Sequence, residues 1–107
     1  MSAVAVIAKQ NDKFRKSLGA SGGAGVVAVT DSVSKMLDKK QHRILEQLCS
    51  YSDWAGHGQE HRCGTFVLDK IDFYWCIDYY QDDKCEVGAT DLTNCFRVLT
   101  IMKSDER

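Results

Sequence analysis

Hydrophobic and aromatic side chains are densest in residues Asp72–Tyr80, where their alternation predicts a β-strand. Successive side chains of a strand point to opposite faces of its sheet. One face would carry Phe73, Trp75, Ile77 and Tyr79. The other would carry Tyr74, Cys76, Asp78 and Tyr80. Neither set is plainly polar, so the pattern predicts an inner strand that is covered on both sides.

Three further segments have the short, β-branched or alternating pattern of strands: Val26–Val29, Cys63–Asp69 and Cys95–Lys103. A turn near Asp69–Asp72 would join the second of these to the aromatic strand as a hairpin. Because sequential strands usually lie side by side, we expect the last three strands to form an antiparallel meander. The pattern does not fix where Val26–Val29 docks.

Helical spacing of apolar residues predicts two longer helices, over Val4–Leu18 and Lys39–Ser52. In the first, Asn11 falls within the apolar stripe; in the second, Asp38 is the expected cap. A glycine-rich turn over residues 19–25 separates the first helix from the first strand. A short helix, capped by Thr30 or Asp31, would run to Leu37.

This order of elements predicts a single α+β domain over residues 1–107, with a frayed tail at 104–107. We expect an antiparallel sheet of three to four strands with two to three helices packed on one face. The content of 44% hydrophobic and 27% charged residues is that of an ordinary globular protein. A net charge of −1 argues against a strongly basic nucleic-acid binder and against an acidic DNA mimic.

No apolar run approaches the roughly 20 residues of a membrane helix, and the first residues lack the basic leader of a signal peptide. We therefore expect a cytoplasmic protein. The five cysteines form no C-x-x-C pair, and we interpret them as reduced thiols, several of them buried.

Short motifs in the chain resemble those of a bacterial family of small proteins, DUF3768. They are Asn11-Asp12-x-Phe14-Arg15, Thr30-x-x-Val33, Glu60-His61-x-x-Gly64, Ile77-Asp78-Tyr79-Tyr80 and Arg97-Val98-Leu99-Thr100-Ile101-Met102. They occur in the order of the family across nearly the whole chain. Residues 55–59 differ from the Asn-Asp-Pro segment of the family, and residues 88–94 lack its proline. The resemblance implies a fold and a bacterial, plasmid or phage setting, and it implies no reaction.

The segment His57-x-x-x-His61-x-Cys63 contains three potential zinc ligands, with Glu60, Cys49 or His42 as a possible fourth. Structural zinc sites are usually built from two separated pairs of ligands, and only one segment qualifies here. We favour a loop in which His61 and Glu60 bond to backbone groups, and we expect neither metal nor cofactor.

Polar residues of several motifs form a second candidate cluster: Asp12, Arg15, Glu60, His61, Asp78 and Arg97. Such a set can perform acid–base chemistry or bind an anion. We favour a structural role, in which Asp78 and Arg97 form a cross-strand ion pair. Asp12 and Arg15 would then tie the first helix to the sheet.

A partner surface is predicted around five residues: Tyr51, Trp54, Asp82, Asp83 and Glu86. The two aromatic residues lie at a helix end beside a glycine-containing loop, where we expect them to be exposed. The acidic residues follow the aromatic strand and would face a basic partner. A protein partner is favoured over nucleic acid, and the chain fits a monomer or a homodimer.

The sequence is compatible with two functions. The first is a non-enzymatic protein-binding module from a phage or mobile element, which inhibits a host defence complex by steric occlusion. An anti-CRISPR protein that blocks a Cas subunit is its concrete form, by analogy alone. The second is a small metal-dependent or acid–base enzyme that uses His57, Glu60, His61 and Asp78.

Overall fold

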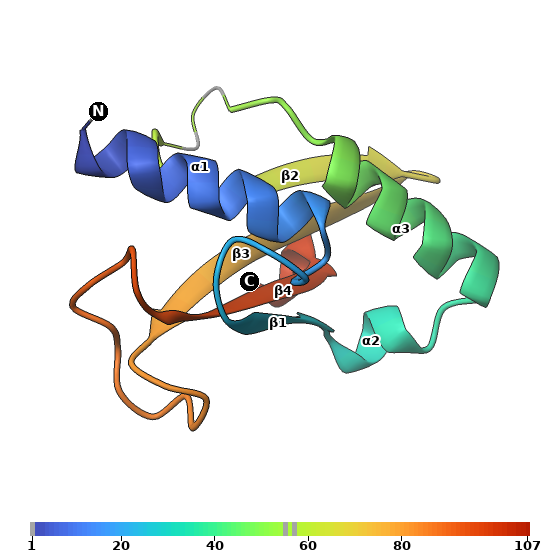
Figure 1. Ribbon diagram of the computed structural model, residues 1–107. Helices are drawn as coiled ribbons and strands as arrows, with labels where there is room; N and C mark the ends of the chain where they lie inside the picture. Colours follow the sequence, from blue (N-terminus) through green and yellow to red (C-terminus); the bar gives the residue numbers. More distant parts are fainter. Residues whose placement is uncertain (1, 55, 57) are drawn as a thin grey trace.

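A four-stranded sheet with the strand order β1-β4-β3-β2 organises the protein (Figure 1). The computed structural model describes residues 2–54, 56 and 58–107. Its elements are α1 (Ala3–Lys16), β1 (Gly25–Val29), α2 (Asp31–Ser34), α3 (Asp38–Ser50), β2 (Cys63–Leu68), β3 (Ile71–Tyr80), β4 (Phe96–Lys103) and the 3-10 helix η1 (Ser104–Glu106). The predicted α+β class is confirmed, and each predicted helix and strand is present with ends within a few residues of its expected bounds.

The predicted meander is confirmed, because β2, β3 and β4 are antiparallel neighbours in sequence order. Asp69 and Lys70 join β2 to β3 with φ angles of 51° and 65°, as expected for a two-residue hairpin turn.

The expectation of a purely antiparallel sheet is wrong, because β1 pairs with β4 in the parallel direction and the sheet is mixed. Gly25 opposes Arg97 in this pairing, and a Cβ atom at Gly25 would collide with the backbone oxygen of Arg97 and with the ring of Phe14. Glycine thus allows the chain to leave its turn directly against β4 and beneath α1.

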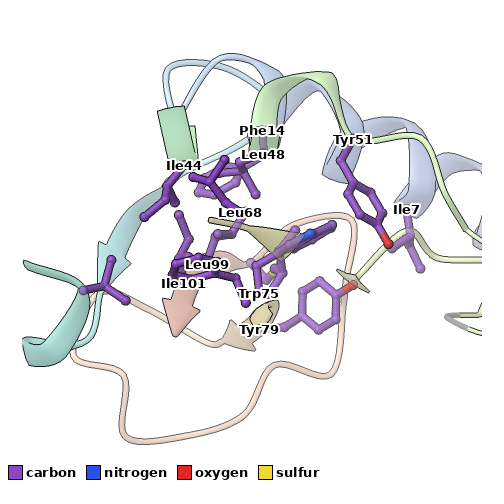
Figure 2. Packing of buried hydrophobic residues seen from close by; sticks show 14 residues of the cluster. Ile7, Phe14, Ile44, Leu48, Tyr51, Leu68, Trp75, Tyr79, Leu99 and Ile101 are labelled. Atoms are coloured by element: carbon purple, nitrogen blue, oxygen red, sulfur yellow. The ribbon is translucent and has the colours of Figure 1, made fainter. Parts of the chain in front are cut away.

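One face of the sheet is covered by α1 and α3, which pack side by side on it (Figures 1 and 2). The aromatic side chains Phe73 and Trp75 of β3 are fully buried there, as are Ile44 and Leu48 of α3. The ring of Tyr51 meets Trp75 edge to face, with centroids 5.4 Å apart. Each fully buried large side chain stabilises the fold by about 1.5–3 kcal/mol relative to exposure, so this face is the core.

Both longer helices lie on that single face, so the prediction that β3 is covered on both sides is wrong. On the opposite face, β3 presents Tyr74, Cys76, Asp78 and Tyr80, all of them partly exposed. One end of this face meets the C-terminal segment. There the guanidinium of Arg107 lies 4.2 Å from the centroid of the Tyr74 ring.

Residues 104–107, expected to fray, include η1. The carboxylate of Glu106 accepts hydrogen bonds from the hydroxyls of Thr30 and Ser32 and from the backbone N–H of Lys103. These bonds lower the pKa of Glu106, the one from Lys103 having the largest effect. Within the residues that the structure describes, no helix is long and apolar enough to cross a bilayer.

Candidate functional site

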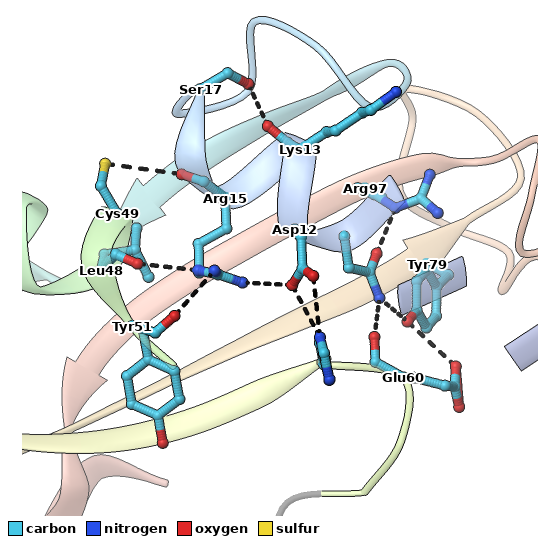
Figure 3. A network of polar contacts seen from close by, with 12 residues as sticks. Asp12, Lys13, Arg15, Ser17, Leu48, Cys49, Tyr51, Glu60, Tyr79 and Arg97 are labelled. Atoms are coloured by element: carbon cyan, nitrogen blue, oxygen red, sulfur yellow. Dashed lines mark hydrogen bonds and ion pairs between the residues drawn. The ribbon is translucent and has the colours of Figure 1, made fainter. Parts of the chain in front are cut away.

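A network of polar side chains lies between α1 and the sheet (Figure 3), and Asn11, which is fully buried, makes three of its hydrogen bonds. The Asn11 amide group donates hydrogen bonds to the Glu60 backbone oxygen at 2.9 Å and to the Tyr79 hydroxyl at 2.8 Å. Its Oδ1 accepts a hydrogen bond of 2.7 Å from Nε of Arg97. One fully buried side chain therefore joins α1, the segment before β2, β3 and β4.

Arg97 is 1% exposed, and its guanidinium also donates to Oε1 of Gln10 and to the backbone oxygen of Leu92. The ring centroid of Tyr79 lies 5.6 Å from this guanidinium. Burial raises the pKa of Tyr79 to about 12, against the opposing effect of the Asn11 hydrogen bond. Tyr79 is therefore a neutral hydroxyl at physiological pH.

Arg15 ties α1 to the C-terminal end of α3 in the same layer. Its guanidinium donates to the backbone oxygens of Leu48 at 3.0 Å and Tyr51 at 3.1 Å, at the C-terminal end of α3. It also forms an ion pair of 3.0 Å with Asp12 and lies 4.9 Å from the centroid of the Trp54 ring. Arg15 is 1% exposed, and these partners compensate the cost of burying its charge.

Asp12 and His61 are the residues of the network that are best arranged for acid–base chemistry. Both carboxylate oxygens of Asp12 lie close to Nδ1 of His61, at 3.0 and 3.1 Å. The imidazole stacks on the Trp54 ring with centroids 4.0 Å apart, and the backbone of His61 has a φ of 56°, a strained conformation for a residue that is not glycine. A carboxylate at Nδ1 makes that nitrogen the donor and leaves Nε2 able to accept or deliver a proton.

The structure brings five of the six predicted cluster residues into this network: Asp12, Arg15, Glu60, His61 and Arg97. The predicted ion pair between Asp78 and Arg97 is wrong. The register places Tyr79, not Asp78, opposite Arg97, and Asp78 opposite Val98. Asp78 therefore lies on the other face of the sheet, where it meets Arg62 at 3.5 Å.

Asn11 and Tyr79 are the members of the network that were not predicted. A signal for Asn11 was present, because it is a polar residue inside the apolar stripe of α1 and must find partners when it is buried. The sequence contains no such signal for Tyr79, because a tyrosine on the core face of a strand is expected to be buried in any case.

The candidate metal ligands are not assembled into a site in the part of the chain that the structure describes, where no group of three His, Cys, Asp or Glu side chains could hold a metal ion. His57 lies outside the described residues. His61 is engaged by Asp12, and Cys63 lies directly opposite Cys76 on β3. Of the candidates for a fourth ligand, His42 pairs with Glu46 on α3.

The predicted partner surface divides into two parts. The expectation that Tyr51 and Trp54 are exposed is wrong for Tyr51, which is 8% exposed and accepts a hydrogen bond from the backbone N–H of Thr65. Trp54 is partly buried between His61 and Arg15. Asp82, Asp83 and Glu86 are all exposed, in the loop that follows β3.

The face of the sheet opposite the helices is a second candidate site, which we call the open face. It carries Asp72, Tyr74, Cys76, Asp78 and Tyr80 of β3, Phe96, Val98, Thr100 and Met102 of β4, Val26 and Ala28 of β1, and Cys63, Thr65 and Val67 of β2. Val67 and Val26 are 63% and 47% exposed. An antiparallel face that meets water is normally polar, whereas this one is mostly apolar or aromatic.

These observations define an α+β protein with a mixed four-stranded sheet, a buried polar network on its helical face and an apolar open face. The model of a family described as a protein of unknown function, DUF3768, matches residues 29–106, so the chain belongs to that family. The match includes Glu60, His61, Tyr79 and Arg97, and α1 lies before it. No curated protein and no solved structure matches the chain.

Proposed function

We propose that this protein is a non-enzymatic protein-binding module that docks through the open face. The observation that carries the proposal is that both sides of β3 are rich in apolar residues, although α1 and α3 both lie on one of them. Contiguous apolar surface of this kind usually marks an interaction site in a soluble protein. Tyr74, Tyr80 and Phe96 are the aromatic residues that would anchor the partner.

The charge beside the open face indicates the chemistry of the partner. Tyr80 is the last residue of β3, and the next residues form a loop that returns to pair Gly88 with Tyr80. A hydrogen bond from the N–H of Gln81 to the oxygen of Val87 closes this loop at the end of the strand. Its exposed carboxylates Asp82, Asp83 and Glu86 outnumber the single Lys84, so they would attract a protein with basic groups beside an apolar patch.

The proposal extends to a target class. A small cytoplasmic protein of near-neutral charge, from a phage or mobile element, acts most simply by covering a surface of a larger complex. A host defence complex is the proposed target, with a basic Cas subunit as its concrete form and steric occlusion as the mechanism. Size, charge and a single apolar face support this step, together with analogy.

The test uses tagged variants of this protein to capture a partner from a bacterial host. The affinity of each variant for the purified partner is then measured. Val98→Lys places a charge in the middle of the open face. Replacement of Asp82, Asp83 and Glu86 by lysine reverses the charge of the loop. Leu37→Lys is the matched control, because Leu37 is 81% exposed and belongs to the segment before α3 rather than to the open face. Circular dichroism and thermal unfolding establish that each variant is folded.

We expect one protein to be held by the native chain and by Leu37→Lys, and to be lost or bound at least tenfold more weakly by the other two variants. Binding that is equal in all four proteins overturns the choice of surface. Assembly of the chain with itself, abolished by Val98→Lys, would replace the foreign partner with a second copy of this chain.

Acid–base chemistry at His61 is a second candidate function. The observation that favours it is the hydrogen bond between Asp12 and Nδ1 of His61, which orients the imidazole as in known catalytic pairs. The larger set of His57, Glu60, His61 and Asp78 is not needed for this version, and Asp78 lies on the other face of the sheet.

A further inference from the structure

Cys63 and Cys76 are directly opposite each other on the antiparallel strands β2 and β3. The neighbouring pair, Arg62 and Ile77, is joined by a ladder hydrogen bond of 2.8 Å from the N–H of Ile77 to the oxygen of Arg62. Hydrogen-bonded and non-hydrogen-bonded pairs alternate along such a ladder, so Cys63 and Cys76 occupy a non-hydrogen-bonded position. Cα atoms at these positions lie about 4.5 Å apart, within the range that a disulfide spans.

We infer that Cys63 and Cys76 are a modification site, at which peroxide forms a reversible disulfide between β2 and β3. Both residues lie on the open face and are partly exposed, so a small oxidant can reach them. The inference goes beyond the proposed docking and does not depend on it.

The surroundings disfavour reaction at two of the other cysteines, Cys49 and Cys95. Burial raises the pKa of the Cys49 and Cys95 thiols, which keeps them protonated.

The reaction balances with hydrogen peroxide as the oxidant. The Cys76 thiolate attacks one peroxide oxygen, the O–O bond breaks, and the leaving hydroxide takes a proton to become water. The resulting sulfenic acid is attacked by the Cys63 thiolate; its S–O bond breaks, the S–S bond forms, and the second oxygen leaves as water. Each peroxide thus accepts two electrons from the two thiols, and a reducing thiol reverses the link by exchange.

The sequence offers a direct test, because trypsin cleaves after Arg62, Lys70 and Lys84 and so places the two cysteines on neighbouring peptides, Cys63–Lys70 and Ile71–Lys84. Each peptide contains one cysteine. The folded, full-length protein is treated with hydrogen peroxide, remaining thiols are blocked with an alkylating agent, and the digest is measured by mass spectrometry. We expect the two peptides joined, with a mass two hydrogens below their sum, and separated again by dithiothreitol.

Cys63→Ser and Cys76→Ser should each abolish the joined peptide, and Cys85→Ser, which removes the exposed thiol of the following loop, should leave it unchanged. In the native protein, oxidation should raise the Tm by about 10 °C because a closed loop constrains the unfolded chain. Alkylation of both Cys63 and Cys76 under conditions that oxidise Cys85 overturns the inference. A link found only between two chains, seen as a dimer on a non-reducing gel, overturns it as well.

Discussion

Oδ1 of Asn11 accepts a 2.7 Å hydrogen bond from Nε of Arg97, a residue 86 positions further along the chain. Both side chains are buried, at 0% and 1% exposure. The bond connects α1, which precedes the region matched by the family model, to β4 within it. The helix is therefore an integral part of the domain, since its Asn11 accepts a hydrogen bond from a buried guanidinium of β4.

Asn11→Ala should lower the free energy of unfolding by about 2–4 kcal/mol, because it removes the hydrogen-bond acceptor of Nε of Arg97 and the donor to the Glu60 carbonyl. Urea denaturation measures the change. Lys13→Ala, on the exposed side of the same helix, should stay within about 0.5 kcal/mol of the native protein. Equal stabilities of the two variants would contradict the central role given to Asn11.

Gly64→Ala should destabilise the protein by about 1–3 kcal/mol, because a Cβ atom at Gly64 would come within 2.6 Å of the Tyr51 hydroxyl oxygen. Gly88→Ala is the matched control, since a Cβ atom there meets nothing within 4 Å. Tyr51→Leu removes the atoms in conflict, so Gly64→Ala should cost less in that background. A double-mutant cycle by urea denaturation measures this coupling, and strict additivity would show that Tyr51 is not the cause.

Stability should fall in alkaline solution as pH rises from about 10 to about 12. Burial raises the pKa of Tyr79 to about 12 in the folded protein, above its value in the unfolded chain, so the neutral hydroxyl is favoured by folding. This contribution, about 2 kcal/mol, is fully present below the unfolded pKa and is lost as pH rises through the folded one.

Tyr79→Phe should be less stable than the native protein at neutral pH, because it loses hydrogen bonds to Asn11 and Glu60, and should depend less steeply on pH in the alkaline window. The check is the urea midpoint as a function of pH, with tyrosinate absorbance recorded on the same samples. Burial also raises the pKa of Tyr51 and Tyr74, so part of the dependence should remain. An unchanged slope in Tyr79→Phe would exclude Tyr79 as a source.

The elements of this fold could be predicted from local patterns, because helical and strand periodicities are properties of short segments. The meander followed from the closeness of its three strands in sequence. The parallel docking of β1 against β4 could not be predicted, because it depends on contacts between residues far apart in the chain. The glycine at position 25 shows only that a close approach of backbone is possible there.

The error over Asp78 and Arg97 has a similar origin. Alternation divides the side chains of each strand into two sets, one for each face of the sheet. The register between strands decides which set of one strand shares a face with which set of the next, and a shift of one residue exchanges the two faces. The apolar open face could be recognised in the sequence as the second side of β3. That both longer helices lie on the other face could not be predicted, because their apolar stripes are able to pack on either side.

His61→Asn separates the two candidate functions. Asparagine tolerates the left-handed backbone that His61 adopts, with a φ of 56°, and its amide can still donate to Asp12, but it can neither accept nor deliver a proton at neutral pH. Loss of the stacking on Trp54 should lower the free energy of unfolding by about 1 kcal/mol.

If docking through the open face is the function, the affinity of the folded His61→Asn variant for the captured partner should equal that of the native protein, measured by calorimetry. If His61 performs acid–base chemistry, partner binding will be unaffected while any turnover by the native protein falls by about 10²–10⁴-fold. A folded His61→Asn protein that no longer binds the partner would contradict docking through the open face, because His61 lies in the network on the helical face.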